Sequence, residues 1–238
     1  MPFVLPLVVF LLVLSCYPDF AESLMPEDVD PETSSRLEIG FNTWKYLFLI
    51  GLQVVLASGF LIFFRKVYLE HFPLRVSVWS VVVGVVGVVL WIAVCDLGLE
   101  PRLLEALGFG ATRPSFNPFT IPDKTVLWLF LVLRFALLAV FVPIIEELFV
   151  RGWLVRWVEN PNWENISLKG LSVMALFTAS FYGVLAHPSE AIAAFLWFGL
   201  VTLLMRKTGN VWDCVVAHAV TNLLLGIYIL KFEQWHLW

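Results

Sequence analysis

Two adjacent carboxylates stand inside a strongly apolar stretch of this sequence. Glu146 and Glu147 lie within VLWLFLVLRFALLAVFVPIIEELFVRGWLVRW, and Arg151 follows four residues after the second. An ionised side chain at membrane depth costs about 3 kcal/mol or more, so such residues are kept mainly for function. The pair is therefore the first candidate for chemistry.

Helical spacing separates the two glutamates. Glu147 and Arg151 are four residues apart, so they share a helix face and can form an ion pair with the acid in the better, N-terminal position. Glu146 is rotated by about 100° and cannot use that arginine equally well. We therefore expect Glu147 to be neutralised and Glu146 to face a cavity. Gly152 should let a neighbouring helix approach closely.

Three further polar side chains interrupt apolar segments. His218 and Asn222 are four residues apart and should face the same cavity, while His187 directly precedes Pro188, which marks a helix end. Since they come from separate segments, convergence on shared hydrogen bonds or water is the cheapest way to satisfy them. Asp213 is expected to complement a helix N-terminus or to line an entrance.

These residue types suit one reaction. A carboxylate in a partly dry pocket can act as general base on a water molecule, which a histidine can help to hold. A second histidine and an amide can donate hydrogen bonds to the oxyanion of a tetrahedral intermediate. The pattern therefore favours peptide hydrolysis by activated water, and the sequence has no GxSxG segment.

Composition places the chain in a membrane. Its 238 residues are 60% hydrophobic and 14% charged, whereas soluble domains carry about 25% charged residues. There is no basic block of the kind that binds nucleic acid, so we expect no nucleic-acid partner. The lipid bilayer is the expected environment.

A membrane-spanning helix needs about 20 apolar residues, and the sequence offers seven segments. They are Pro2–Tyr17, Trp44–Phe64, Val76–Val94, Val126 through the glutamate pair, Leu171–Ala186, Ala191–Met205 and Val211–Leu230. We predict an all-α polytopic membrane protein of about seven transmembrane helices, folded as a single transmembrane domain over residues 1–238 around a polar intramembrane cavity. The first segment could instead be a signal peptide, but no Lys or Arg precedes Arg36, so we expect a retained helix.

Positive charge predicts the orientation. Three loops carry the cations and should lie on the cytoplasmic side, with the N-terminus inside and the C-terminus outside; the residues are Arg65, Lys66, Arg75, Arg151, Arg156, Lys169, Arg206 and Lys207. The alternate loops hold acids, among them Asp19, Glu22, Glu27, Asp28, Asp30, Glu32 and Glu38, and the longest exterior loop runs from Gly98 to Asp123.

Straight helices would separate the candidate residues. Glu146 would lie near the cytoplasmic side and His187 near the far end of its helix. We therefore expect either that segments 171–186 and 191–205 form a short hairpin ending within the membrane, or that Pro143 bends its helix inward. A water-filled funnel would permit irregular backbone at that depth.

Two motifs resemble those of a known family. EELFVR fits the EExxxR motif, and HAVTN fits the HxxxN motif, of the CPBP family of intramembrane proteases, which includes the eukaryotic CAAX prenyl endopeptidases. The order and spacing match from Glu146 to Asn222, with His187 at the position of the middle motif. The resemblance implies a family-like catalytic core over about 125–230 and accessory N-terminal helices over 1–97.

The resemblance also implies roles. Glu146 would be the water-activating base together with His187, and His218 with Asn222 would form the oxyanion site. Glu147 and Arg151 would have supporting roles.

One departure concerns the middle motif, which in the family reads FxxxH. Gly183 stands four residues before His187, with Phe181 and Tyr182 just upstream. We interpret this as altered packing or substrate shape rather than lost activity. The N-terminal half resembles bacterial members that accompany exosortase-type protein sorting, which implies a bacterial inner membrane.

Zinc is the alternative to a metal-free mechanism. Glu146, His187 and His218 match a catalytic zinc ligand set, but HExxH is absent and no carboxylate partner for either histidine is evident. Asn222 is a poor zinc ligand and a good oxyanion donor. We predict a glutamate mechanism that requires no cofactor.

The predicted function is that of an intramembrane endopeptidase acting on a membrane-embedded or membrane-tethered protein or peptide. One alternative is a catalytically inactive membrane scaffold or bacteriocin-immunity-type protein. Another is a transporter with an intramembrane carboxylate.

Overall fold

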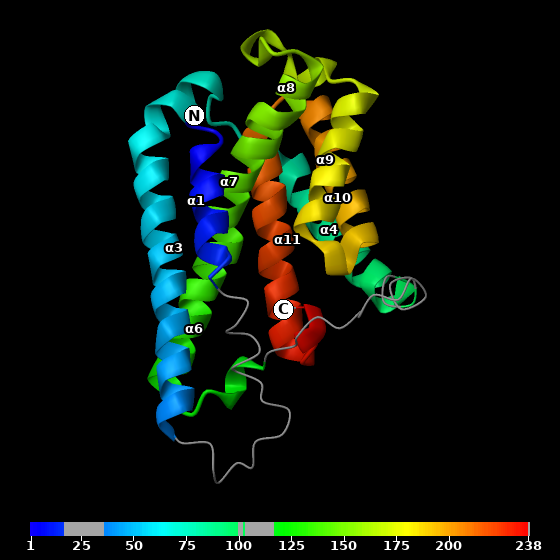
Figure 1. The fold of residues 1–238 in the computed structure, drawn as a ribbon. Helices are drawn as coiled ribbons and strands as arrows, with labels where there is room; N and C mark the ends of the chain where they lie inside the picture. The colour runs from blue at the N-terminus through cyan, green and yellow to red at the C-terminus, as the bar shows by residue number, and fades with distance from the viewer. Residues whose placement is uncertain (17–35, 100–101, 103–116, 238) are drawn as a thin grey trace.

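The computed structural model describes residues 1–16, 36–99, 102 and 117–237, with side chains from residue 44 onward in the second stretch. All regular structure in these residues is helical, which confirms the predicted fold class (Figure 1). The principal single helices are α1 (Leu5–Leu14), α3 (Arg36–His71), α4 (Val78–Asp96), α9 (Val173–Ala186), α10 (Ala191–Thr208) and α11 (Val211–Phe232). Short 3-10 turns lie at Pro118–Thr120, Trp163–Asn165, Leu168–Gly170, Pro188–Glu190 and Trp235–Leu237.

Five helical stretches in the described residues are long and apolar enough to cross a membrane. They are Trp44–His71, Val78–Asp96, Lys124–Glu159, Pro188–Thr208 and Val211–Phe232. The protein is therefore a multi-pass integral membrane protein, but the predicted count of seven crossings is not confirmed. Helices α1 and α9 have 10 and 14 residues, or about 15 and 21 Å, against about 30 Å of hydrocarbon.

The helical stretch that carries the glutamates is irregular. It runs through α6 (Lys124–Ala136), the π-helical turn η2 (Leu137–Phe141), α7 (Val142–Phe149), the π-helical turn η3 (Val150–Leu154) and α8 (Val155–Glu159). Pro143 follows η2 closely and has no N–H to donate to a preceding carbonyl, so the backbone widens there without ending the helix. The glutamates thus lie in a short α-helical piece bracketed by two wide turns.

The hairpin of α9 and α10 is short. Helix α9 begins after the capping residue Ser172, whose hydroxyl accepts a hydrogen bond from the Met174 amide at 3.0 Å, and it ends before His187. In Figure 1 the turn between α9 and α10 lies partway down the bundle, above the lower ends of α6 and α11. Helix α9 is therefore shorter than a membrane crossing, whereas Pro188–Thr208 is long enough for one; that the hairpin ends within the membrane stays a prediction.

Three cation-bearing connections meet at one end of the bundle, but not every predicted loop cation lies in a loop: Arg65 and Lys66 belong to α3, and Arg151 is buried in η3. The Asn210 amide donates to the Arg75 carbonyl at 2.6 Å, and the Trp212 indole donates to the Phe72 carbonyl at 2.7 Å. Gly209, at φ +67°, lies so close to Lys169 that a Cβ there would be 2.8 Å from its Cε. That this end faces the cytoplasm stays a prediction.

The acids expected at the other end mostly cannot be placed. Residues 17–35 and the side chain of Glu38 lie outside the described residues, as do 100–101 and 103–116 of the long loop.

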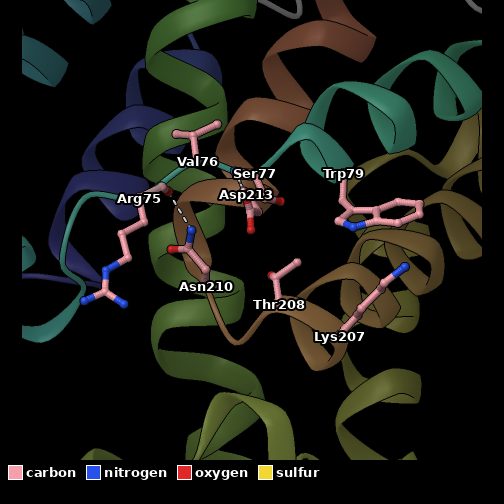
Figure 2. Close-up of a pocket in the computed structure, with 8 residues that line it drawn as sticks. All are labelled: Arg75, Val76, Ser77, Trp79, Lys207, Thr208, Asn210 and Asp213. Carbon is pink, nitrogen blue, oxygen red and sulfur yellow. Dashed lines mark hydrogen bonds between the residues drawn. The ribbon is translucent and has the colours of Figure 1, made fainter.

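One buried carboxylate joins the starts of α4 and α11. Asp213, in the first turn of α11, is 1% exposed and accepts a hydrogen bond from the Ser77 backbone N–H at 2.6 Å. Ser77 is the residue before α4, and Figure 2 shows the two side by side with Asn210 nearby. The carboxylate therefore complements the N-terminal dipoles of both helices. The sequence predicted this for a single helix.

Replacing Asp213 with Ala should lower the free energy of unfolding by about 1–3 kcal/mol, because the half-buried Ser77 N–H loses its acceptor. Chemical denaturation of the purified protein in detergent measures this. Ser77→Ala is the matched control, since it keeps the backbone N–H and the Ser77 side chain makes no capping bond. Equal losses in the two variants would contradict this account.

Candidate active site

Glu147 is the centre of a buried polar network. Its Oε1 accepts hydrogen bonds from Arg151 Nη1 and from His218 Nδ1, both at 2.9 Å. Both Glu147 and Arg151 are 0% exposed. The predicted ion pair is therefore present, and it lies in the protein interior rather than at a solvated helix end.

Arg151 extends the network to the hairpin. Its Nη2 donates to the Phe198 carbonyl of α10 at 2.9 Å, and its guanidinium lies 4.8 Å from the centre of the Phe198 ring. The arginine thereby connects η3 with α10. Gly152, next in the chain, is close to the Phe72 and Phe3 rings, so its neighbours are aromatic side chains rather than a helix backbone.

Glu146 has a different environment, as the helical spacing predicted. Its Oε1 accepts a hydrogen bond from the Tyr182 hydroxyl at 2.7 Å, and its Oε2 lies 3.7 Å from His218 Nε2. Unlike Glu147, it lines a cavity. One glutamate is thus paired with an arginine, and the other faces open space.

The contacts of His218 define its tautomer. Glu147 is paired with Arg151, so its carboxylate only accepts hydrogen bonds, and His218 Nδ1 must carry the proton between them. This assignment follows from the hydrogen-bond network. Nε2 then points toward Glu146, and the Trp197 ring, 4.7 Å away at 66°, restrains the imidazole.

Pro143 explains the position of Asn222. In the π-helical turn the Val142 N–H bonds to the Leu137 carbonyl, five residues back. In that register the Leu138 carbonyl would accept from residue 143, which is a proline and has no N–H. Asn222 Nδ2 donates to this carbonyl instead, at 2.9 Å. An amide nitrogen has two hydrogens, so Asn222 can still donate into the cavity that it lines.

His187 approaches the same cavity from the end of α9. Its backbone, at φ −133° and ψ 65°, leaves the helix, and its half-buried ring lies 5.4 Å from the Trp91 ring and 6.2 Å from the Phe198 ring. The structure thus brings Glu146, His187, His218 and Asn222 to one cavity of about 480 Å³. Their catalytic roles stay predictions.

Beyond this polar end the cavity is mainly apolar. It continues between α1, α3, η2 and α11, where Tyr46, Gln53 and Arg134 are the polar exceptions among its lining residues. The Arg134 Nη1 donates to the Tyr46 hydroxyl at 2.9 Å. The aliphatic lining includes Leu7, Leu11, Leu14, Ile50, Leu137, Leu225 and Ile229. An apolar chamber therefore adjoins the candidate catalytic groups.

The side chains as arranged do not fit a zinc site. No three His, Cys, Asp or Glu side chains in the described part of the chain gather closely enough to hold a metal ion. Glu147 does give His218 the carboxylate partner that the sequence did not reveal. We therefore derive no step through a metal.

Tyr182 is the site residue that sequence reasoning missed. A tyrosine in an apolar helix usually packs as an aromatic residue, and its spacing from Glu146 carries no signal. The one hint is its position, five residues before His187.

Gly183 has a packing role in the structure, which agrees with one part of the interpretation made from the sequence; that activity is retained stays a prediction. A Cβ at this position would fall 2.4 Å from Phe198 Cδ2, so no side chain fits. The Phe198 ring from α10 occupies the space beside this position. The Phe198 ring lies beside Tyr182 as well as His187.

We expect Gly183→Phe to lower the unfolding temperature strongly, because two rings would need the same volume. Adding Phe198→Ala to this variant should recover part of the loss, so the two substitutions should be non-additive by about 1–3 kcal/mol. Thermal unfolding of the four proteins in detergent completes this cycle, and simple additivity would show that the rings do not compete.

Comparison with known proteins agrees with the motifs. Residues 127–224 match the family model described as type II CAAX prenyl endopeptidase Rce1-like. This segment includes every predicted site residue and confirms the family resemblance over its length. No curated protein and no solved structure matches the chain.

Proposed function

We propose that this protein is an intramembrane endopeptidase that hydrolyses a peptide bond with water activated by Glu146. The Rce1-like match supports a protease of the CAAX type. The observation that carries the glutamate mechanism is the unequal pairing of the two acids. Arg151 neutralises Glu147 at 2.9 Å, whereas Glu146 presents its carboxylate to the cavity.

In the proposed reaction Glu146 removes a proton from a water molecule as the water oxygen attacks the peptide carbonyl carbon. The carbonyl π bond breaks and gives a tetrahedral oxyanion. When the intermediate collapses, the C–N bond breaks, and the protonated Glu146 returns the proton to the leaving amine. No covalent bond to the enzyme forms.

His218 and Asn222 are proposed to stabilise the oxyanion, with His187 helping to hold the water. Because Nδ1 donates to Glu147, His218 can donate from Nε2 only when the ring carries both protons. The hydrogen bond from Nδ1 to Glu147 at 2.9 Å fixes the orientation of the imidazole. Glu147 and Arg151 would therefore support catalysis by orienting His218.

The proposed substrate is a membrane-embedded or membrane-tethered protein or peptide. The apolar chamber beside the polar groups supports this class, because it can hold apolar side chains while the scissile bond lies near Glu146. The proposed location is the bacterial inner membrane. Comparing the membrane peptides of cells with the wild-type protein and with Glu146→Ala would identify the substrate.

Glu146→Gln should reduce the cleavage rate by about 10²- to 10⁴-fold, because an amide cannot act as the base. The assay follows quenched fluorescent casein with purified protein in phosphatidylcholine vesicles. The unfolding temperature should change little. A scaffold, by contrast, would retain its function in this variant, and unchanged cleavage would contradict the proposal.

Glu147→Gln makes the same chemical change as Glu146→Gln, one residue further along the helix, and is the matched comparison. It removes one partner of a buried ion pair, so the free energy of unfolding should fall by about 3–5 kcal/mol. Both variants should therefore lose cleavage rate, but only Glu147→Gln should also lose substantial stability.

Metal removal tests the cofactor prediction. The protein is dialysed against 1,10-phenanthroline and EDTA, and its zinc content is quantified by mass spectrometry. The casein cleavage rate should be unchanged when the protein holds much less than one zinc ion per molecule. A rate that falls with the zinc content and returns on adding zinc would favour the alternative ligand set, which is Glu146, His187 and His218.

A further inference from the structure

Tyr182 makes a contact that packing alone does not require. Its hydroxyl donates to Glu146 Oε1 at 2.7 Å, and its side chain lines the cavity together with that carboxylate. A second phenol, that of Tyr68, donates to the Pro2 carbonyl at 2.6 Å and does not line this cavity. The acceptor of Tyr68 is a neutral backbone group, whereas the acceptor of Tyr182 is the proposed base.

The ring of Tyr182 is held from two sides. Its centre lies 5.7 Å from that of Phe149 on α7 and 5.5 Å from that of Phe198 on α10. The Phe198 ring reaches this place because Gly183 has no side chain. The phenol ring is therefore packed between residues of two other helices, α7 and α10.

This arrangement distinguishes the two oxygens of the Glu146 carboxylate. Oε1 is engaged by the phenol, while Oε2 lies toward His218 Nε2 at 3.7 Å. Without the phenol the carboxylate could rotate about its terminal torsion, which is broad for glutamate. A base that is held in one orientation gives a larger fraction of productive encounters with the water.

We infer that Tyr182 is a positioning residue, which binds Glu146 Oε1 so that Oε2 is the oxygen that takes the proton from water. This inference rests on the proposed function. It gives a role to the residues around Gly183, where the sequence differs from the family's FxxxH motif. Gly183 leaves space for the Phe198 ring, Phe198 packs against Tyr182, and Tyr182 orients the base.

The test is Tyr182→Phe, which removes one hydroxyl and keeps the ring. With quenched fluorescent casein and purified protein in phosphatidylcholine vesicles, kcat should fall by about 10- to 100-fold, the range expected for a hydrogen bond to a charged group. KM should stay within about twofold, since substrate binding does not use the hydroxyl. In a Glu146→Gln background, adding Tyr182→Phe should produce no further loss.

Tyr68→Phe is the matched control. It removes a buried phenol hydroxyl of similar geometry, so it should lower the unfolding temperature and leave kcat unchanged. If Tyr182→Phe keeps kcat, or if both variants lose kcat equally, Tyr182 does not position the base. Cleavage that survives Glu146→Gln would instead refute the proposed function itself, so the two failures are distinguishable.

Discussion

The buried ion pair between Glu147 and Arg151 is the interaction on which the rest of the site depends. Removing two charges from water is costly, and the cost is offset only when additional hydrogen bonds satisfy them. Here Glu147 also accepts from His218, and Arg151 also donates to the Phe198 carbonyl. The pair therefore fixes α7 and η3 against α10 and α11. It also decides which nitrogen of His218 carries the proton, and so what this imidazole can do in the cavity.

The irregular backbone near Pro143 also helps to build the site, because it positions Asn222. The π-helical turn and Pro143 together leave the Leu138 carbonyl without a helical donor, and Asn222 takes that place at 2.9 Å. An unsatisfied carbonyl at membrane depth would cost several kcal/mol, so the irregularity and the amide stabilise each other. A residue that looks like a helix breaker in the sequence thus positions a side chain from a distant helix.

The cavity joins groups that straight helices would keep apart. Because α9 has 14 residues and its turn lies partway down the bundle, His187 reaches the cavity of Glu146 (Figure 1). The short hairpin also leaves α1 and α3 to complete the apolar part of the lining. Aromatic rings fill several of these contacts, and the Phe198 ring lies beside Tyr182, His187 and Arg151. The polar and apolar halves of one cavity are therefore built by different parts of the chain.

The helical fold, the membrane environment and the separation of Glu147 from Glu146 could be predicted from the sequence, because hydrophobic segments and 3.6-residue periodicity are local properties. It also indicated His187, His218 and Asn222. The folded structure was needed to show the lengths of α1 and α9, the contact of Glu147 with His218 and the contact of Tyr182 with Glu146. Those contacts join residues between 36 and 71 positions apart, and no local pattern encodes the packing that brings them together.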